Sequence, residues 1–279
     1  MQITIENYLG QQLQLDDNFK VISVDGLTPA DATINTSGAG IADGTFYNSS
    51  YVNQRNIVLT IVPEGNAEQG RLTLWKYFKP KYPCTLYFKT NTRYVYINGY
   101  VETIQGSPYE NKARYQISVI CPQPFFIDMT PAVYTQSVTS DAFIFPVTIP
   151  EEGVIFGNVT SGISVNVENV GEEQSGVVIE LIASGNVVNP TIYNTTTREY
   201  FTISVEMVEG DSIIIDTRRG KKTITMYHNG QAINILNKML HGSTWFTLQQ
   251  GDNEFTYTCA YGDFNLSVQY TLYTLYEGV

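Results

Sequence analysis

The stretch GDSIIIDTRRGKKTITMYHNG, residues 210 to 230, indicates the fold class. Ile213 and Ile215 share one face of a first strand, and Ile224 and Met226 share one face of a second. Between the two strands, RRGKK supplies the glycine and the charge of a turn. Alternation with a period of two on both sides of such a turn predicts a β-hairpin.

The acids of this stretch raise the question of a catalytic site. Asp211 and Asp216 are five positions apart, so on a regular strand their side chains leave opposite faces and cannot form a glycosidase-type pair. Asp216 stands where the strand meets the turn, and aspartate there commonly accepts hydrogen bonds from nearby backbone N–H groups. We therefore predict structural roles for both acids.

The composition extends the β prediction to the whole chain. Its 279 residues are 43% hydrophobic, enough for one large domain or two ordinary ones, and two fit better. The abundant Tyr, Phe, Thr, Val and Ile suit pleated, half-buried surfaces better than helices. We predict a mainly β protein with two domains.

Charge is distributed unevenly along the chain. Residues 1 to 128 hold 11 acids and 10 bases, whereas residues 129 to 279 hold 16 acids and 6 bases. This split supports a boundary near the middle. The acidic second half argues against sequence-specific nucleic-acid binding there.

Cysteines and apolar runs exclude other classes of protein. Cys84, Cys121 and Cys259 are an odd number without a CxxC motif, so we expect buried, inert thiols. The start, MQITIENYLG, lacks the basic and apolar regions of a secretion signal. No apolar run reaches the ~18 residues of a membrane-spanning helix, so we expect no membrane insertion and folding in a reducing cytoplasm.

Two segments of the first half differ from its strands. Residues 34 to 54, INTSGAGIADGTFYNSSYVNQ, have little periodicity, and so long a loop in a compact domain suggests a function. Residues 66 to 80, NAEQGRLTLWKYFKP, predict the one convincing helix. Leu72, Trp75 and Phe78 are expected to form its core-facing stripe.

Three prolines interrupt the strand pattern in PQPFFIDMTP, residues 122 to 131. We place a linker at residues 129–140, between a first domain of residues 1–128 and a second of residues 141–279. The second domain contains many short strands separated by turn signals, which suggests a sandwich or jelly roll.

Known catalytic and metal-binding motifs are absent from the sequence. His228 and His241 stand in no metal-ligand spacing, and no GxSxG, P-loop or HExxH motif occurs. Carboxylates from different strands could still meet, but solvated turns explain the adjacent acids better, Glu151, Glu152, Glu172 and Glu173. Trp245 could stack on a sugar, but such an aromatic is more often a core residue. We predict no catalytic, cofactor-binding or metal-binding residues.

Several segments occur in a specific order along the chain: ADG at 42–44, RNIVLTIVPEG at 55–65, LWKYFKPK at 74–81, YVYINGYVE at 94–102, ICPQPFF at 120–126, FIFPVTIPEEGVIFG at 143–157, NVGEEQSGVVIELIASGNVVNPTIYN at 169–194, GDSIIIDTRRGKKTI at 210–224 and WFTLQQGDNEFTY at 245–257. In this order and spacing, the sequence resembles the distal tail protein (Dit) family of long-tailed, siphovirus-type bacteriophages and prophages. The resemblance covers nearly the whole chain.

The resemblance implies a structural protein and not an enzyme: a homo-hexameric hub at the tail tip that joins the tail tube to the host-adsorption apparatus. It implies a β-barrel-like, ring-forming N-terminal domain with one short helix and a galectin-like C-terminal β-sandwich. Its implied partners are further copies of itself, the tail-tube protein, the tape measure, the tail-associated lysin or spike and, in some relatives, a receptor-binding protein. The implied location is the tail tip of the virion, after assembly in the bacterial host cytoplasm.

Two candidate contact surfaces follow from this resemblance. Ring subunits of the family clasp their neighbours with extended segments, so we expect subunit contacts from the apolar residues of the long loop, Ile41, Phe46, Tyr47, Tyr51 and Val52. The turn of the 210–230 hairpin offers a basic tip on an otherwise acidic domain. It could dock an acidic partner through Arg218, Arg219, Lys221 and Lys222, but a solvated turn without a partner explains these bases better.

A glycan-binding adhesin or carbohydrate-binding module protein is the alternative, since the second domain resembles a galectin. The His, Asn, Arg and Trp signature of sugar-binding galectins has no match in this sequence. The chain is also too short for the carbohydrate-binding modules inserted in some relatives. The tail hub is therefore the favoured hypothesis.

Overall fold

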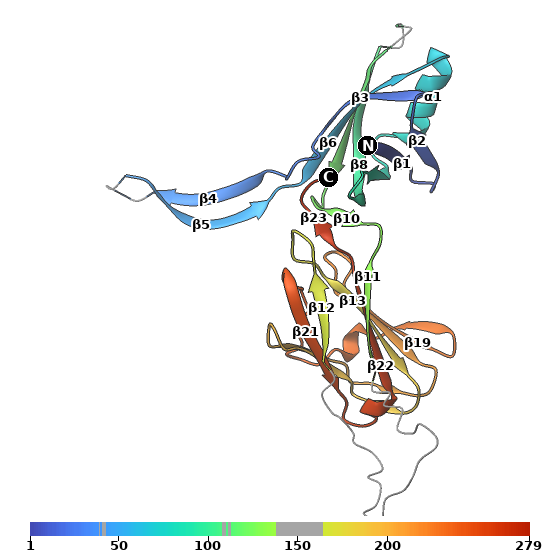
Figure 1. Cartoon of the computed structure of the whole chain (residues 1–279). Helices are drawn as coiled ribbons and strands as arrows, with labels where there is room; N and C mark the ends of the chain where they lie inside the picture. Colours follow the sequence, from blue (N-terminus) through green and yellow to red (C-terminus); the bar gives the residue numbers. More distant parts are fainter. Residues whose placement is uncertain (39, 41–42, 108–109, 111–112, 138–163) are drawn as a thin grey trace, which may run out of the picture. The chain divides into compact units, whose positions relative to one another are not determined.

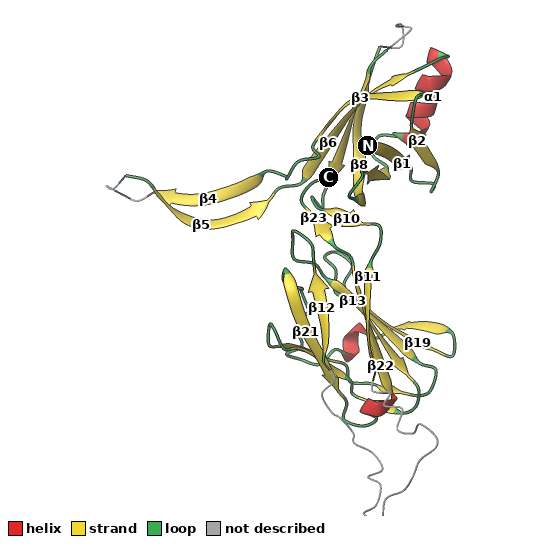
Figure 2. Ribbon diagram, in the orientation of Figure 1, coloured by secondary structure: helices red, strands yellow, loops and turns green. Residues whose placement is uncertain are grey.

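The structure is a computed structural model that describes all residues except 39, 41–42, 108–109, 111–112 and 138–163. The chain divides into two compact units, residues 1–130 with 275–279, and residues 131–274. Strands dominate both units (Figures 1 and 2), so the prediction of a mainly β fold is confirmed.

The first unit is built on a nine-stranded antiparallel sheet with the main order β2-β1-β7-β8-β9-β6-β3. Alternate residues of its strands are buried, as expected of a sheet with one face on a core. The end strands β2 and β3 do not pair with each other, so the sheet is not closed into a barrel. Its main strands are β1 (Gln2–Glu6), β2 (Gln12–Leu15), β3 (Phe19–Asp25), β6 (Arg55–Pro63), β7 (Pro83–Lys89), β8 (Tyr94–Gln105) and β9 (Tyr115–Cys121).

Two short strands, β10 (Phe126–Asp128) and β23 (Leu275–Tyr276), extend this sheet from β8. Phe126 pairs with Tyr276 and Ile127 with Leu275, so the last residues of the chain belong to the first unit. The buried Arg55 side chain donates hydrogen bonds to the backbone carbonyls of Pro124 and Glu277. Arg55 therefore ties the C-terminal segment to the strand β6.

The predicted helix is present as α1 (Ala67–Tyr77), and the side chain of Asn66 caps it by accepting hydrogen bonds from the N–H groups of Glu68 and Gln69. Its buried positions are Gly70 and Leu74, followed by the buried Phe78 just past its end. A Cβ atom at Gly70 would lie 2.4 Å from Cβ of Pro63, so glycine lets the helix approach β6 closely.

The predicted core stripe of α1 was wrong at two of its three positions. Phe78 is buried, but Leu72 is 51% exposed and Trp75 is 46% exposed. Gly70 and Leu74 form the side of α1 that faces the sheet. Leu72 lies two positions from Leu74 and Trp75 lies one position from it, so both side chains point away from that buried side.

Most described residues of the segment 34–54 are not an irregular loop. They form a two-stranded antiparallel hairpin of β4 (Ala32–Gly38) and β5 (Thr45–Val52), whose sheet is separate from the nine-stranded sheet. In Figure 1 this hairpin extends away from the other strands of its unit. The sequence pattern hid the strands because Ser, Asn and Gly occupy both faces, and a bulge at Asn48 shifts the alternation.

The second unit is a sandwich of two antiparallel sheets. One has the order β11-β22-β13-β18-β19-β20 and the other β12-β21-β15-β16. Their inward residues form one core, which includes Ile179 and Tyr270 of the first sheet and Phe201 and Phe255 of the second. The strands are β11 (Ala132–Ser137), β12 (Val165–Asn169), β13 (Val177–Ala183), β15 (Thr191–Asn194), β16 (Glu199–Thr202), β18 (Ser212–Asp216), β19 (Thr223–His228), β20 (Gln231–Asn234), β21 (Gly251–Thr258) and β22 (Leu266–Leu272).

Smaller elements complete this unit. Strands β14 (Val187–Val188) and β17 (Glu206–Met207) pair with each other, and the short helices are η1 (Leu236–Lys238) and η2 (Asp263–Asn265).

The hairpin predicted at residues 210–230 is confirmed as β18 and β19, with Ile213 opposite Met226 and Ile215 opposite Ile224. All four side chains are buried.

The two units differ from the predicted domain boundaries in two places. Residues 132–137 of the predicted linker form β11, which pairs along β22 in the second unit. Residues 275–279 belong to the first unit and not to the second. Both differences arise from strand pairing between segments more than 100 residues apart, which local sequence patterns do not encode. Residues 138–140 of that linker lie outside the described residues.

Candidate interaction surfaces

Asp211 and His228 form a close pair beside the turn that precedes β18. Nδ1 of His228 lies 2.7 Å from Oδ1 of Asp211, and Oδ2 of Asp211 accepts a hydrogen bond from the N–H of Val208. The other ring nitrogen of His228 lies 3.0 Å from Nδ2 of Asn229. Both imidazole nitrogens of His228 therefore have polar partners within the protein. The contact between His228 and Asp211 connects β19 to the turn before β18.

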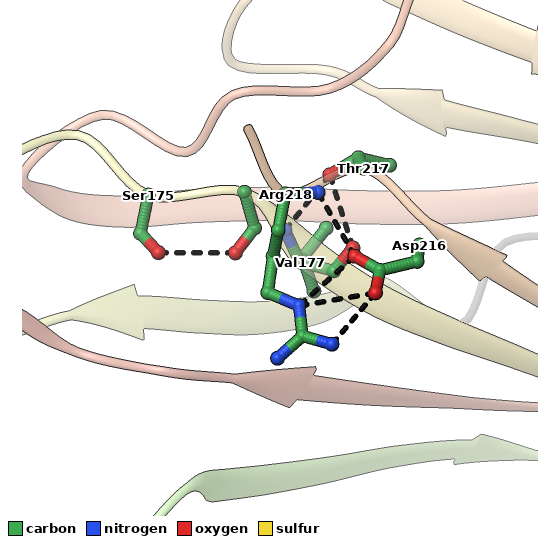
Figure 3. Close-up of polar contacts among 6 residues, drawn as sticks. Ser175, Val177, Asp216, Thr217 and Arg218 are labelled. Atoms are coloured by element: carbon green, nitrogen blue, oxygen red, sulfur yellow. Dashed lines mark hydrogen bonds and ion pairs between the residues drawn. The ribbon is translucent and has the colours of Figure 1, made fainter. Parts of the chain in front are cut away.

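Asp216 has a separate set of partners around the turn after β18 (Figure 3). Its carboxylate accepts hydrogen bonds from the backbone N–H and the guanidinium of Arg218. The hydroxyl of Thr217 accepts a hydrogen bond from the N–H of Val177 and donates one to the carbonyl of Val177. The prediction that Asp216 caps this turn is confirmed. Asp211 and Asp216 thus interact with different residues at opposite ends of β18.

The predicted basic tip is smaller than the sequence suggested. Arg218 is held by Asp216, and its guanidinium lies over the Tyr273 ring at 4.3 Å from the centroid. Arg219, Lys221 and Lys222 are exposed. The tip that faces solvent therefore consists of these three bases.

A shallow groove lies next to this tip. Its apolar lining comes from Leu236, Met239, Leu240 and Trp245, and its polar lining includes Lys222. Trp245 is half-buried: it packs edge-on against Phe201, with 5.2 Å between ring centroids, and Nζ of Lys222 lies 5.6 Å from its centroid. Trp245 thus contributes to both the core and a surface depression of about 530 Å³.

The β4–β5 hairpin exposes the predicted subunit-contact residues. Phe46 is 65% exposed, Tyr47 64% and Tyr51 57%, and Val52 is also exposed. Ile41 lies outside the described residues. The sequence prediction omitted Ile34, which is equally exposed on β4. This concentration of apolar side chains is large for a solvated hairpin.

The helix α1 carries a second exposed apolar pair, Leu72 and Trp75. They are three positions apart and so share one side of the helix. The guanidinium of Arg71 lies 5.2 Å from the centroid of the Trp75 ring. Sequence analysis missed this surface because helical spacing does not reveal which side of a helix meets the core.

Two of the acids considered for glycosidase chemistry lie at the surface of the second unit. Glu172 and Glu173 lie with Gln174, Gln249 and Gln250 around an open surface depression. Glu151 and Glu152 lie outside the described residues. Within the described ranges, no group of three or more His, Cys, Asp or Glu side chains could hold a metal ion.

The thiols of the three cysteines are unpaired, and Cys84 and Cys121 are buried. Burial raises the pKa of the thiols of Cys84, Cys121 and Cys259 to about 12 each. They remain protonated at neutral pH, which suits apolar packing better than nucleophilic chemistry. Among the helices described, none has the length and hydrophobicity to span a bilayer.

Comparisons with known proteins agree with this architecture. Residues 170–272 match the family model of the siphovirus-type tail component, C-terminal domain. A search of curated proteins finds no match. Among solved structures, the Dit protein of phage SPP1 is similar with a TM-score of 0.69 and 12% identity, over 97% of this chain and 98% of that one. It is described as a paradigm of the hub adsorption apparatus in phages that infect Gram-positive bacteria.

Chains of the phage P2 baseplate in its activated conformation are also similar. The calcium form matches with a TM-score of 0.61 and 13% identity, over 100% of this chain and 99% of that one. The strontium form matches with a TM-score of 0.60 and 14% identity over the same shares. At such identities the structural matches establish the fold, while the family model identifies the second unit. Residues 170–272 therefore match the C-terminal domain of a siphovirus-type tail component, and the chain as a whole shares its fold with the Dit protein of phage SPP1.

Proposed function

We propose that this chain is a Dit-type tail protein that forms a homo-hexameric ring at the tail tip, where it joins the tail tube to the host-adsorption apparatus. The family model matched by residues 170–272 and the fold shared with the SPP1 Dit protein and the P2 baseplate chains support a role as a phage tail or baseplate hub component. The ring, its six copies and its position at the tip, after assembly in the host cytoplasm, form the proposal. The role is structural and needs no catalytic site.

The observation that carries this proposal is the exposed β4–β5 hairpin. A two-stranded hairpin is at best marginally stable alone in water, and this one presents Phe46, Tyr47 and Tyr51 to solvent. Burial of apolar area at about 25 cal/mol per Å² would favour a contact at these residues. The nearly balanced charge of residues 1–128 imposes little electrostatic repulsion between copies of this part of the chain.

The test is the mass and shape of the purified full chain. Light scattering after gel filtration is expected to give a particle of six copies, and negative-stain images should show rings with a central opening. A particle that remains monomeric over a wide range of concentrations would contradict self-assembly by this chain. A closed dimer would contradict the ring.

The proposed neighbours are the tail-tube protein, the tape measure, the tail-associated lysin or spike and a receptor-binding protein. The tip formed by Arg219, Lys221 and Lys222 supports docking of an acidic partner through electrostatic attraction, which salt weakens. Binding of purified tail proteins to the parent and to a variant with these three bases replaced by Ser would test this at two salt concentrations. The expected result is weaker, less salt-sensitive binding by the variant.

Glycan binding by the second unit is the alternative function. The observation in its favour is the groove beside Trp245, because a half-buried aromatic ring with neighbouring polar groups can stack on a sugar. A glycan array would distinguish the two functions. If the parent chain binds a glycan and Trp245→Ala abolishes that binding, the adhesin function is supported. If the parent binds no glycan on the array, the tail-hub function remains the better hypothesis.

A further inference from the structure

The turn between β19 and β20 consists of Asn229 and Gly230. The strand ladder closes at the pair of His228 and Gln231, so the two residues between them form a loop outside it. Their φ angles are positive, 50° for Asn229 and 74° for Gly230, as in the type I′ turns that asparagine–glycine pairs favour. Both residues are exposed, and β20 is the last strand of its sheet.

An asparagine–glycine pair has a reactivity of its own. The backbone nitrogen of the residue that follows an asparagine can attack Cγ of the side-chain amide and close a succinimide ring. Glycine leaves this nitrogen unhindered, because it has no Cβ. A Cβ atom built on Gly230 would meet no heavy atom within 4 Å apart from its chain neighbours. The turn therefore offers open space around the attacking nitrogen.

His228 lies against the amide that would react. Its Nε2 atom lies 3.0 Å from Nδ2 of Asn229, and its Nδ1 atom lies 2.7 Å from Oδ1 of Asp211. A carboxylate oxygen only accepts hydrogen bonds, so Nδ1 carries the hydrogen of the neutral imidazole and Nε2 accepts from the Asn229 amide. Asp211 thereby determines both the tautomer and the orientation of the ring.

Asp211 is itself held in place. Its side chain is buried, and its Oδ2 atom accepts a hydrogen bond from the N–H of Val208. A buried acid that orients an imidazole, which in turn contacts a reacting group, is the arrangement by which proteins position a histidine for proton transfer. Here the third group is the amide of Asn229. Its nitrogen, which lies next to the imidazole, is the atom that leaves when a succinimide forms.

We propose that Asn229 is a site of spontaneous deamidation, and that His228, positioned by Asp211, assists the loss of ammonia. The backbone nitrogen of Gly230 gives its proton to water and bonds to Cγ of Asn229. The bond between Cγ and Nδ2 breaks, and Nδ2 leaves as ammonia. The imidazole of His228 takes a proton from water and delivers it to the leaving nitrogen. Water then opens the succinimide to aspartate or isoaspartate.

Either product alters the edge of the second unit. Aspartate at position 229 adds a negative charge beside His228. Isoaspartate adds a carbon atom to the backbone of a turn whose type and length set the register of its hairpin. All residues of β20 are exposed, and the strand pairs only with β19. The reaction therefore loosens an edge strand slowly and irreversibly.

The chain contains a second asparagine–glycine pair that serves as an internal control, Asn98 and Gly99. Asn98 is also exposed, but the pair lies within β8, opposite Thr85 and Cys84 of β7. Oδ1 of Asn98 accepts a hydrogen bond from the hydroxyl of Thr85 at 2.9 Å. A Cβ atom on Gly99 would lie 2.6 Å from Cγ1 of Val119, so this glycine is tightly enclosed. Attack on the Asn98 amide requires local opening of β8.

Peptide mapping by mass spectrometry, after incubation of the purified full chain near neutral pH, measures conversion at both sites. Asn229 is expected to convert at least about ten-fold faster than Asn98, because opening a paired strand costs free energy that an exposed turn does not require. Chromatography of the same peptides separates aspartate from isoaspartate. Equal conversion at the two sites, or none at Asn229, would overturn the modification site.

Two variants test the role of His228. His228→Gln keeps a polar side chain but cannot transfer a proton. It should slow conversion of Asn229 by at least about ten-fold, below the about 10²–10⁴-fold that proton transfer contributes in enzymes, and leave Asn98 unchanged. His241→Gln replaces the other histidine, which is exposed, and should change neither rate. Thermal unfolding checks that both variants fold. An unchanged Asn229 rate in folded His228→Gln would overturn the role of His228.

This inference does not depend on the proposed self-assembly. A parent chain that forms rings without conversion of Asn229 would contradict the modification site and support the proposed function. A chain that converts at Asn229 but never self-associates would do the reverse.

Discussion

Arg218 donates hydrogen bonds to the carboxylate of Asp216 from both Nε and Nη2, with 2.6 Å between Nη2 and Oδ2. The acid that ends β18 therefore neutralises the first base of the following turn. Asp216 is itself mostly buried, and its remaining partner in the turn is the backbone N–H of Arg218. The pair belongs to the framework of the turn, whereas Arg219, Lys221 and Lys222 are exposed to solvent.

Replacement of Arg218 by Ala should destabilise the second unit by about 1–2 kcal/mol, because it leaves a mostly buried carboxylate without its cationic partner. The matched control replaces Arg219, Lys221 and Lys222 together by Ala and should change the free energy of unfolding by less than about 0.5 kcal/mol. Urea unfolding measures both. Equal effects of the two variants would contradict the structural role of Arg218.

Replacement of Ile213 or Ile215 by Ala should cost about 2–5 kcal/mol, the usual range for removing buried methyl groups from a core. Ile214 lies between them on the other face of β18 and is only partly buried, so Ile214→Ala should cost clearly less. Thermal and urea unfolding of the three single variants would compare the two faces. A variant of Ile213 that unfolds like the Ile214 variant would show that β18 has a different register.

Deletion of residues 275–279 should destabilise the first unit, although these residues are distant from it in sequence. The deletion removes β23 from β10 and takes one carbonyl acceptor from the buried Arg55. We expect a loss of about 2–4 kcal/mol from the unpaired charged donor and the lost strand pair. Trp75 lies in the first unit and Trp245 in the second, so fluorescence can follow each separately.

The fluorescence experiment has an internal control. With Trp245→Phe as background, Trp75 should report a lower unfolding midpoint after the deletion. With Trp75→Phe as background, Trp245 should report an unchanged midpoint for the second unit. A deletion that shifts only the Trp245 signal would show that the C-terminal segment supports the other unit.

The buried cysteines predict a loss of stability at alkaline pH. Burial raises the pKa of Cys84 and Cys121 to about 12, above the value of about 8.5 in an unfolded chain. Above that lower value the unfolded state releases protons that the folded state retains, so the free energy of unfolding falls as pH rises from about 8.5 to about 12. Below pH 8 this contribution to stability is fully present.

Urea unfolding between pH 7 and 10.5 measures this loss, with the single variants Cys84→Ala and Cys121→Ala as controls that should show a smaller alkaline slope. A thiol reagent at pH 8 provides a second check. Cys84 and Cys121 should react only after unfolding, and rapid reaction in the native protein would show that they are accessible.

Local patterns were sufficient to predict the hairpin of β18 and β19. Ile213, Ile215, Ile224 and Met226 alternate with a period of two, and the turn between them has glycine and charge. Every contact that defines this hairpin joins residues close in sequence. For the same reason, the segment 66–80 contained the helix α1, since helix capping and helix termination depend on neighbouring residues.

Tertiary structure alone decided which side of α1 faces the core. Leu72, Leu74 and Trp75 are all apolar, but only Leu74 is buried, because Gly70 allows close packing on Pro63 along that side. The orientation of α1 depends on the surface of β6 against which it packs. Helical periodicity in the sequence carries no information about that surface. The exposure of Leu72 and Trp75, and with it a candidate contact surface, was therefore invisible to sequence analysis.

The sequence by itself determined the β character of the chain, the position of its helix and the strands with regular alternation, because these depend on contacts within a few residues. Three features required the tertiary structure: the β4–β5 hairpin with its bulge at Asn48, the return of Leu275 and Tyr276 to the first unit, and β11 within the predicted linker. Each of these features depends on backbone hydrogen bonds between strands. The types of the side chains do not specify which strands form those bonds. A register shift of one residue also reverses which face a side chain occupies, so only the pairing itself could place Tyr47 and Tyr51 on opposite faces.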